Sequence, residues 1–228
     1  MKTKKGSLIA GITICALTVL LTVVYVALSG ASVSAESTPP CDIEKSYAKE
    51  AIEAVTASGL MSAQKINDSY YFFPTMSVSR SEIAKVLCVY LELDVKKYVT
   101  TEIGFADEAE IDKEILPYIR AAVSGGYIKL NSDYTFRAND YISREEAADI
   151  FGALCTIAVS AGKHERFSDF ESISPHFEAN AKKLIDLEIM IGYPDDTFRP
   201  KNILTREELA LILYRMTQNE NFRYQIKG

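Results

Sequence analysis

Apolar residues recur at helical spacing in two series of segments along this chain. One series keeps the i, i+4, i+7, i+8 spacing of a single helix face. It comprises Ile115, Ile119, Ala122 and Val123, and then Phe177, Ala181, Leu184 and Ile185. The other series occurs three times, as Ile83, Ala84, Leu87 and Tyr90, as Ala147, Ala148, Phe151 and Leu154, and as Leu209, Ala210, Leu213 and Met216. Because one helix cannot bury such a stripe alone, we predict a shared helical core and an all-α fold.

These stripes belong to a sequence repeat whose two later copies lie 62 residues apart. Phe105-Ala106-Asp107 recurs as Phe167-Ser168-Asp169, and Ile142-Ser143-Arg144-Glu145-Glu146 recurs as Leu204-Thr205-Arg206-Glu207-Glu208. An earlier copy, Val78-Ser79-Arg80-Ser81-Glu82, is more divergent. The sequence therefore predicts three helix-loop-helix units.

Turn-forming residues separate the two helices of each unit. Gly59 and Gly126 stand just past the expected first helices, where glycine accepts a left-handed backbone without a Cβ clash. Glu188 occupies the same place in the third unit. Asn, Asp, Ser and Pro residues follow, which is turn chemistry. We expect these segments to be loops with at most short extended pieces.

The N-terminal segment has the pattern of an export signal. Lys2, Lys4 and Lys5 precede an uncharged stretch, and Val33-Ser34-Ala35 offers small residues at the usual cleavage positions. The apolar core is longer than a usual signal and long enough to cross a bilayer. Residues 1–35 are thus expected to be either a cleaved signal peptide or a retained membrane anchor, with residues 7–28 contacting the membrane.

Charge and cysteine usage exclude several function classes. The formal net charge of -6 argues against a nucleic-acid partner, which would require a basic face. Cys88 and Cys155 fall within apolar helical patterns and are expected to be buried, and no disulfide framework is indicated. His164 and His176 lie outside any metal-ligand spacing, and no hydrolase or phosphate-binding motif occurs. We predict no enzyme activity, no metal and no cofactor.

The start of each second helix carries residues of two kinds. Three pairs have the spacing of a capping box: Ser79 with Glu82, Ser143 with Glu146, and Thr205 with Glu208. Between them, Arg80, Arg144 and Arg206 occupy the first helical position, where the helix dipole disfavours a cation by about 0.3–1 kcal/mol. We interpret them as carboxylate-binding residues that act beside free helix N–H groups. Alternatively, each arginine pairs internally with an acid such as Asp107 or Asp169 and pins neighbouring units together.

The segment 191–200, Ile-Gly-Tyr-Pro-Asp-Asp-Thr-Phe-Arg-Pro, followed by Leu-Thr-Arg-Glu-Glu at 204–208, resembles the signature of S-layer homology domains. The resemblance is strongest in repeat 3 (167–217), good in repeat 2 (105–157) and weak in repeat 1 (43–95). It implies a pseudo-threefold arrangement of the three repeats around a central three-helix bundle, with grooves between neighbours. It also implies non-covalent anchoring to the bacterial cell envelope through an anionic secondary cell-wall polysaccharide, commonly one that carries pyruvate ketals.

Several positions of the family's motif carry over to this sequence. They are the arginines Arg80, Arg144 and Arg206, the opening aspartates Asp107 and Asp169, and the pair Gly192 and Tyr193. Repeat 1 has no opening Phe-x-Asp, and repeat 2 has Leu130-Asn131 where Gly-Tyr is expected. We therefore expect binding in the grooves that use Arg144 and Arg206.

The resemblance implies an extracellular location at the cell wall or cell surface, with other envelope proteins as further partners. If the divergent grooves have lost sugar binding, the chain is instead a protein-interaction scaffold of the envelope. A polysaccharide-processing enzyme would need two carboxylates facing each other across a bond, and the adjacent Asp195 and Asp196 do not suggest such a pair.

Overall fold

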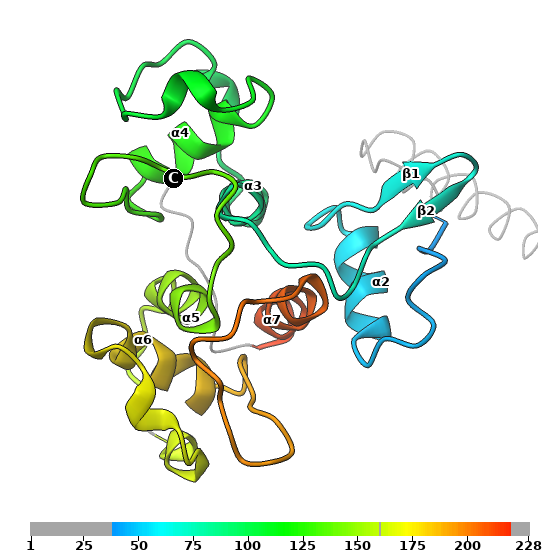
Figure 1. Cartoon of the computed structure of the whole chain (residues 1–228). Coiled ribbons are helices and arrows are strands. Elements are labelled where there is room, and N and C mark those ends of the chain that lie inside the picture. The colour runs from blue at the N-terminus through cyan, green and yellow to red at the C-terminus, as the bar shows by residue number, and fades with distance from the viewer. Residues whose placement is uncertain (1–37, 160, 220–228) are drawn as a thin grey trace, which may run out of the picture. The chain divides into compact units, whose positions relative to one another are not determined.

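Six α-helices and one small hairpin form the part of the chain described by the computed structural model, which covers residues 38–159 and 161–219. In chain order these elements are α2 (Lys49–Ala57), β1 (Gln64–Ile66), β2 (Ser69–Tyr71), α3 (Arg80–Tyr90), α4 (Leu116–Ser124), α5 (Arg144–Ala153), α6 (Pro175–Asp186) and α7 (Arg206–Gln218) (Figure 1). The hairpin pairs Gln64 with Tyr71 and Ile66 with Ser69 in antiparallel register. The all-α prediction is confirmed, and the hairpin is one of the short extended pieces expected in the loops.

The predicted signal peptide or membrane anchor at residues 1–35 lies outside the described residues. Among the helices between residues 38 and 219, none combines the length and the apolar character needed to cross a bilayer.

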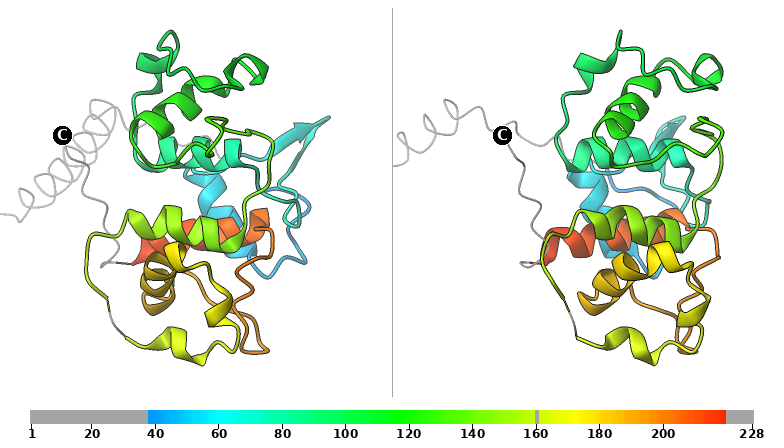
Figure 2. Two further views of the ribbon diagram at one scale, coloured as in Figure 1. Left: turned by 60° about the vertical axis from the view of Figure 1, so that its left-hand side comes forward. Right: turned by 90° about the vertical axis from the view of Figure 1, so that its left-hand side faces the viewer.

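The helices form an inner and an outer set. Helices α3, α5 and α7 lie side by side at the centre, and α2, α4 and α6 lie outside them (Figures 1 and 2). Each outer helix packs on the inner helix of the preceding unit: α4 on α3, α6 on α5, and α2 on α7. The last contact brings the first helix of unit 1 against the last helix of unit 3. The expected bundle of three central helices is therefore present, and the three units form a closed ring around it (Figure 1).

A ring of backbone hydrogen bonds ties the three inner helices together just before they begin. The Ile142 N–H donates to the carbonyl of Val78 at 3.0 Å, Val78 donates to Leu204 at 2.9 Å, and Leu204 donates to Ile142 at 2.9 Å. All three residues are buried, so their side chains close one end of the core. Each unit contributes one donor and one acceptor, which gives the fold its pseudo-threefold symmetry.

The outer helices end as the turn pattern predicts. Gly59 and Gly126 take left-handed φ values of +75° and +72°, and Glu188 takes +58° at the equivalent place. A residue with a Cβ in this conformation costs roughly 1–2 kcal/mol, so Glu188 is held there by the surrounding helix end. Cys88 and Cys155 are buried, as expected, and Cys41 is exposed.

Candidate functional site

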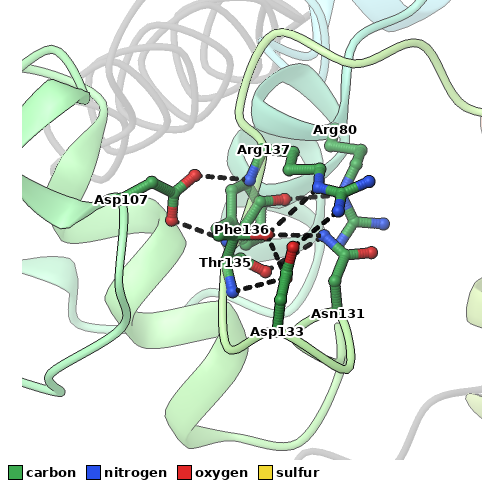
Figure 3. Close-up of polar contacts among 7 residues, drawn as sticks. All are labelled: Arg80, Asp107, Asn131, Asp133, Thr135, Phe136 and Arg137. Carbon is green, nitrogen blue, oxygen red and sulfur yellow. Dashed lines mark hydrogen bonds and ion pairs between the residues drawn. The ribbon is translucent and has the colours of Figure 1, made fainter.

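Each inner helix begins with an arginine that reaches across to the loop of the next unit. Arg144 Nε donates to the Phe198 carbonyl at 2.9 Å and Arg144 Nη2 to the Ile191 carbonyl at 3.2 Å. The guanidinium also lies 5.0 Å from the Phe198 ring centroid. The other two arginines repeat this contact. Arg80 donates to the carbonyls of Phe136 (Figure 3) and Lys129. Arg206 donates to those of Phe72 and Ser62. The three arginines thus clamp unit 2, unit 3 and unit 1 in turn.

Two of these arginine clamps include a carboxylate. Arg144 Nη1 pairs with Glu208 at 3.1 Å, and both side chains are buried. Arg206 pairs with Glu82 in the same way. The pinning of neighbouring units is therefore observed, but the acids are Glu82 and Glu208 rather than Asp107 or Asp169.

The opening aspartates hold the loops instead. The two carboxylate oxygens of Asp107 accept from the backbone N–H groups of Phe136 and Arg137, each at 2.7 Å (Figure 3). Asp169 accepts from Phe198 at 2.7 Å and from Arg199 at 2.8 Å. These bonds fix the loop whose carbonyls the arginine clamps, because a charged acceptor strengthens both backbone hydrogen bonds.

Unit 1 also contains an aspartate that accepts hydrogen bonds from two loop N–H groups, which the sequence interpretation missed. Asp42 accepts from the N–H groups of Phe72 at 2.8 Å and Phe73 at 2.7 Å. Pro40 is buried two positions earlier, where the other units have Phe105 and Phe167. Unit 1 has no Phe-x-Asp, as its sequence indicated, but the triplet Pro40-Cys41-Asp42 supplies the opening aspartate in its place. The spacing from Asp42 to Phe72, one residue longer than in the other units, was the available signal.

The helix N–H groups that we expected to be free for an anion are occupied. In α5, Arg144 N donates to Asn202 O at 2.9 Å and Glu145 N donates to Pro200 O at 2.9 Å. The third amide, Glu146 N, donates to Ser143 Oγ at 3.3 Å. Helices α3 and α7 repeat this pattern. The expectation of free N–H groups at these helix starts was wrong, because neighbouring loops and the capping side chains already satisfy the amides.

Two of the three predicted capping boxes are complete. Ser143 with Glu146 and Thr205 with Glu208 form both reciprocal hydrogen bonds. Ser79 accepts from Glu82 N at 3.2 Å, but the Glu82 carboxylate pairs with Arg206 and does not return to the cap. Of the two hydrogen bonds predicted for the capping box of Ser79 and Glu82, only one is formed.

A cavity of about 430 Å³ lies beside the clamp of Arg144. Unit 1 contributes Tyr47, unit 2 contributes Arg144, and the remaining residues come from unit 3. Those are Met190, Ile191, Gly192, Tyr193, Pro194, Glu208, Leu211, Ile212 and Arg215. Of the predicted site residues, Arg144, Gly192 and Tyr193 meet here. Arg80, Arg206, Asp107 and Asp169 lie outside this cavity's lining.

The polar groups that line the cavity are the phenols of Tyr47 and Tyr193, the guanidinium groups of Arg144 and Arg215, and the Glu208 carboxylate. The Tyr193 hydroxyl donates to Glu208, and burial together with this bond raises the pKa of Tyr193 to about 12. Partial burial of its hydroxyl group, on a side chain that is otherwise largely exposed, and the carboxylates of Glu208 and Glu207 also raise the pKa of Tyr47. Both phenols therefore remain neutral hydrogen-bond donors at neutral pH. Arg144 and Arg199 lie over the Tyr193 ring, at 5.0 Å and 4.0 Å from its centroid.

The family model for the S-layer homology domain matches residues 104–148 and 166–210. Repeats 2 and 3 of the chain are S-layer homology domains. The match includes the opening aspartate, the loop and the arginine of repeats 2 and 3, which are the parts that build the clamps.

Curated relatives of this chain include three proteins of Acetivibrio thermocellus. The chain is 28% identical to the exoglucanase XynX over 187 residues, which covers 79% of this chain and 16% of that protein. It is 27% identical to cell surface glycoprotein 1 over 158 residues, 63% of this chain and 6% of that protein. It is 34% identical to a cellulosome-anchoring protein over 85 residues, 36% of this chain and 19% of that protein. The chain thus spans less than a fifth of each relative.

The S-layer homology loops of repeats 2 and 3 share a backbone but differ in side chains. Tyr193 N donates to Thr197 O at 2.8 Å, and Asn131 N donates to Thr135 O at 2.9 Å in the equivalent turn. Repeat 2 therefore has an amide where repeat 3 has an aromatic ring. A Cβ on Gly192 would lie 2.1 Å from the Phe167 ring and 2.4 Å from Thr197 O, so the loop of repeat 3 excludes any other residue there.

A metal centre was not predicted, and residues 38–159 and 161–219 hold no cluster of three or more potential metal ligands. His164 lies 3.2 Å from the buried carboxylate of Asp186, which also accepts from two backbone N–H groups. This contact ties the segment between repeats 2 and 3 to α6.

Proposed function

We propose that this chain anchors non-covalently to the bacterial cell envelope by binding an anionic, pyruvylated secondary cell-wall polysaccharide in a groove between its repeats. The two S-layer homology domains support the general role of envelope anchoring, because this domain is a cell-wall anchoring module. The names of the cellulosome-anchoring protein and cell surface glycoprotein 1 support a location at the cell surface or cell wall.

The observation that carries the proposal is the cavity in which Tyr47, Arg144 and Tyr193 come together from three repeats. Tyrosine side chains suit sugar rings because the aromatic face packs against the apolar face of the sugar, while the phenol hydroxyl can form a hydrogen bond. A pyruvate ketal carries a carboxylate and a methyl group on one carbon. A cavity with guanidinium groups among apolar walls, here Met190 and Leu211, is complementary to both.

We propose distinct roles for the predicted site residues. Arg144, Gly192 and Tyr193 line the sugar-binding groove directly. Asp107 and Asp169, with the clamps of Arg80 and Arg206, hold the loops that shape the repeats. We further propose that residues 43–95 are a divergent S-layer homology repeat, which joins repeat 2 (105–157) and repeat 3 (167–217) to complete the ring.

Co-sedimentation with wall sacculi tests this function. We expect the purified protein to sediment with intact sacculi and to remain in solution after the ketals are removed chemically. Tyr193→Ala should lose most of the binding, because it removes the aromatic wall of the groove. Asn131→Ala, at the equivalent turn of repeat 2, is the matched control and should bind normally. Failure of the folded protein to bind intact sacculi would favour the protein-interaction scaffold instead.

A further inference from the structure

The two arginines of the cavity differ in how their hydrogen-bond donors are used. Arg144 is 4% exposed, and its three guanidinium nitrogens donate to Phe198 O, Ile191 O and Glu208. These bonds use three of its five N–H donors and hold the loop to the helix, and burial of the side chain limits a ligand's access to the other two. Arg144 in the cavity wall is therefore buried and bonded mainly to other parts of the protein.

Arg215 lies in α7, nine residues after Arg206. It is half-buried and also lines the cavity. A guanidinium has five N–H donors. Within residues 38–159 and 161–219, the acceptor found for Arg215 is the Ile189 carbonyl, at 3.3 Å from Nη1. No ion pair with a carboxylate is formed by Arg215 in that part of the chain. Most of its donors are therefore available to a ligand.

The acids near Arg215 are engaged elsewhere. Glu208 binds Arg144, the Tyr193 hydroxyl and the Thr205 N–H, and Glu188 pairs with Lys163 at 3.0 Å. Burial and the neighbouring charge of Arg144 lower the pKa of Arg215, yet a guanidinium stays protonated in proteins. The negative charge of Glu188 opposes this lowering of the pKa, but no carboxylate forms an ion pair with Arg215 among the described residues. The result is a partly desolvated cation that an added anion would stabilise.

We infer that Arg215 is the residue that binds the polymer's carboxylate, and that Tyr47 supports it as a sugar platform and hydroxyl donor. This inference rests on the proposed function and names the anion contact within that groove. Tyr47 is 67% exposed, and it enters the groove from repeat 1 because α2 packs on α7. The site is therefore complete only when the ring of repeats is closed.

The other two grooves lack this pair. Nine residues after the clamping arginine, repeat 2 has Ala153 and repeat 1 has Val89 in place of Arg215. The counterpart of Tyr47 is found from the serine before it. Ser46 donates to Glu207, and Ser174 makes the equivalent bond to Glu145. The residue after Ser174 is Pro175, so this groove has a proline in place of Tyr47. We expect one polymer-binding site in each chain, although the clamps repeat three times.

A thermodynamic cycle tests the contact between Arg215 and the carboxylate. The purified protein is titrated calorimetrically with soluble wall-polysaccharide fragments, with and without their pyruvate ketals. We expect one site per chain, and Arg215→Gln should weaken binding of ketal-bearing fragments by about 10- to 100-fold, since a hydrogen bond to a charged group contributes about 1.5–3 kcal/mol. Ketal-free fragments should bind the unmodified protein only weakly, and Arg215→Gln should bind them equally weakly, because the carboxylate that Arg215 would contact is gone.

Controls separate this contact from a structural role. Arg215→Lys should retain part of the affinity, and Arg137→Gln removes an equal charge from an exposed loop and should bind normally. Arg215→Gln should leave the unfolding midpoint unchanged. An equal loss on both kinds of fragment, or unchanged binding to ketal-bearing fragments, would overturn the inference while leaving the anchoring function intact. Absence of binding by the unmodified protein would instead overturn the proposed function, and two or three sites per chain would overturn the single-site assignment.

Discussion

The clamps of Arg144 and Arg80 use the same backbone contacts but lie in different surroundings. Each arginine donates through Nε to a phenylalanine carbonyl, Phe198 in one case and Phe136 in the other. Arg144 is buried and adds the Glu208 carboxylate. Arg80 is partly exposed. Glu146, the counterpart of Glu208, completes its capping box with Ser143 as Glu208 does with Thr205, but among the described residues it forms no ion pair with Arg80.

This difference separates the architecture of the repeat from its ligand chemistry. What the two clamps share, an arginine on two loop carbonyls and an aspartate on two loop N–H groups, holds one unit to the next. What differs lies around the cavity of repeat 3: Tyr193 against Asn131, and Arg215 against Ala153. A repeat can therefore keep its motif, and its place in the ring, after its groove has lost the side chains that we propose contact the polymer.

The largest expected effect is on folding stability, and it distinguishes the two clamps. Arg144→Gln should lower the free energy of unfolding by about 3–5 kcal/mol, because the Glu208 carboxylate would stay buried without its cation. Arg80→Gln should lower it by about 1.5–3 kcal/mol, since it removes only bonds from a charged donor to carbonyls. Urea unfolding measures both. Equal losses would mean that the buried ion pair adds nothing to the clamp.

A second comparison sets the divergent repeat against a matched one. Asp42→Asn and Asp169→Asn each replace a carboxylate that accepts two backbone N–H groups. We expect each substitution to lower the free energy of unfolding by about 1–3 kcal/mol, because an amide has one acceptor oxygen and its NH₂ group would face a donor. The change is measured by urea unfolding, with Asp68→Asn in the exposed hairpin turn as the control. A negligible effect of Asp42→Asn alone would separate repeat 1 from the other two in its stabilisation.

Local features of this fold could be predicted from the sequence, and features that depend on contacts between units could not. The stripes of apolar residues located the helices, and Ser143 and Thr205 marked helix starts, because these signals act over one or two turns. The burial of Cys88 followed from the same pattern. In contrast, the partners of Arg144 come from loops about 50 residues away, and no local pattern shows that those carbonyls occupy its donors.

The divergent first repeat also shows that contacts between residues far apart in the sequence could not be predicted from local patterns. Asp42 was missed because the motif around it has changed, while its contact with the N–H groups of Phe72 and Phe73 has not. The role of Glu82 was also ambiguous, since its spacing from Ser79 fits a cap and its actual partner, Arg206, lies in another repeat. Ring closure between the two ends of the domain decides such cases.

The smallest expected effect concerns the titration of Tyr193, which Asn131 replaces in repeat 2. An unfolded tyrosine has a pKa of about 10, whereas burial and the bond to Glu208 raise the pKa of Tyr193 to about 12. Between these values the unfolded chain releases the phenol proton while the folded chain keeps it. The stability that Tyr193 contributes is therefore present below pH 10 and is lost as the pH rises through 12.

Tyr193→Phe removes this titration. Below pH 10 the unmodified protein should be the more stable of the two by about 1 kcal/mol, the contribution of one hydrogen bond, and the difference should shrink as the pH rises toward 12. Urea unfolding at several pH values measures it. Asn131→Ala should show a difference from the unmodified protein that does not change with pH, because neither side chain titrates. A pH-independent difference for Tyr193→Phe would mean that the Glu208 contact does not hold the phenol in its neutral form, and that the two turns differ in shape alone.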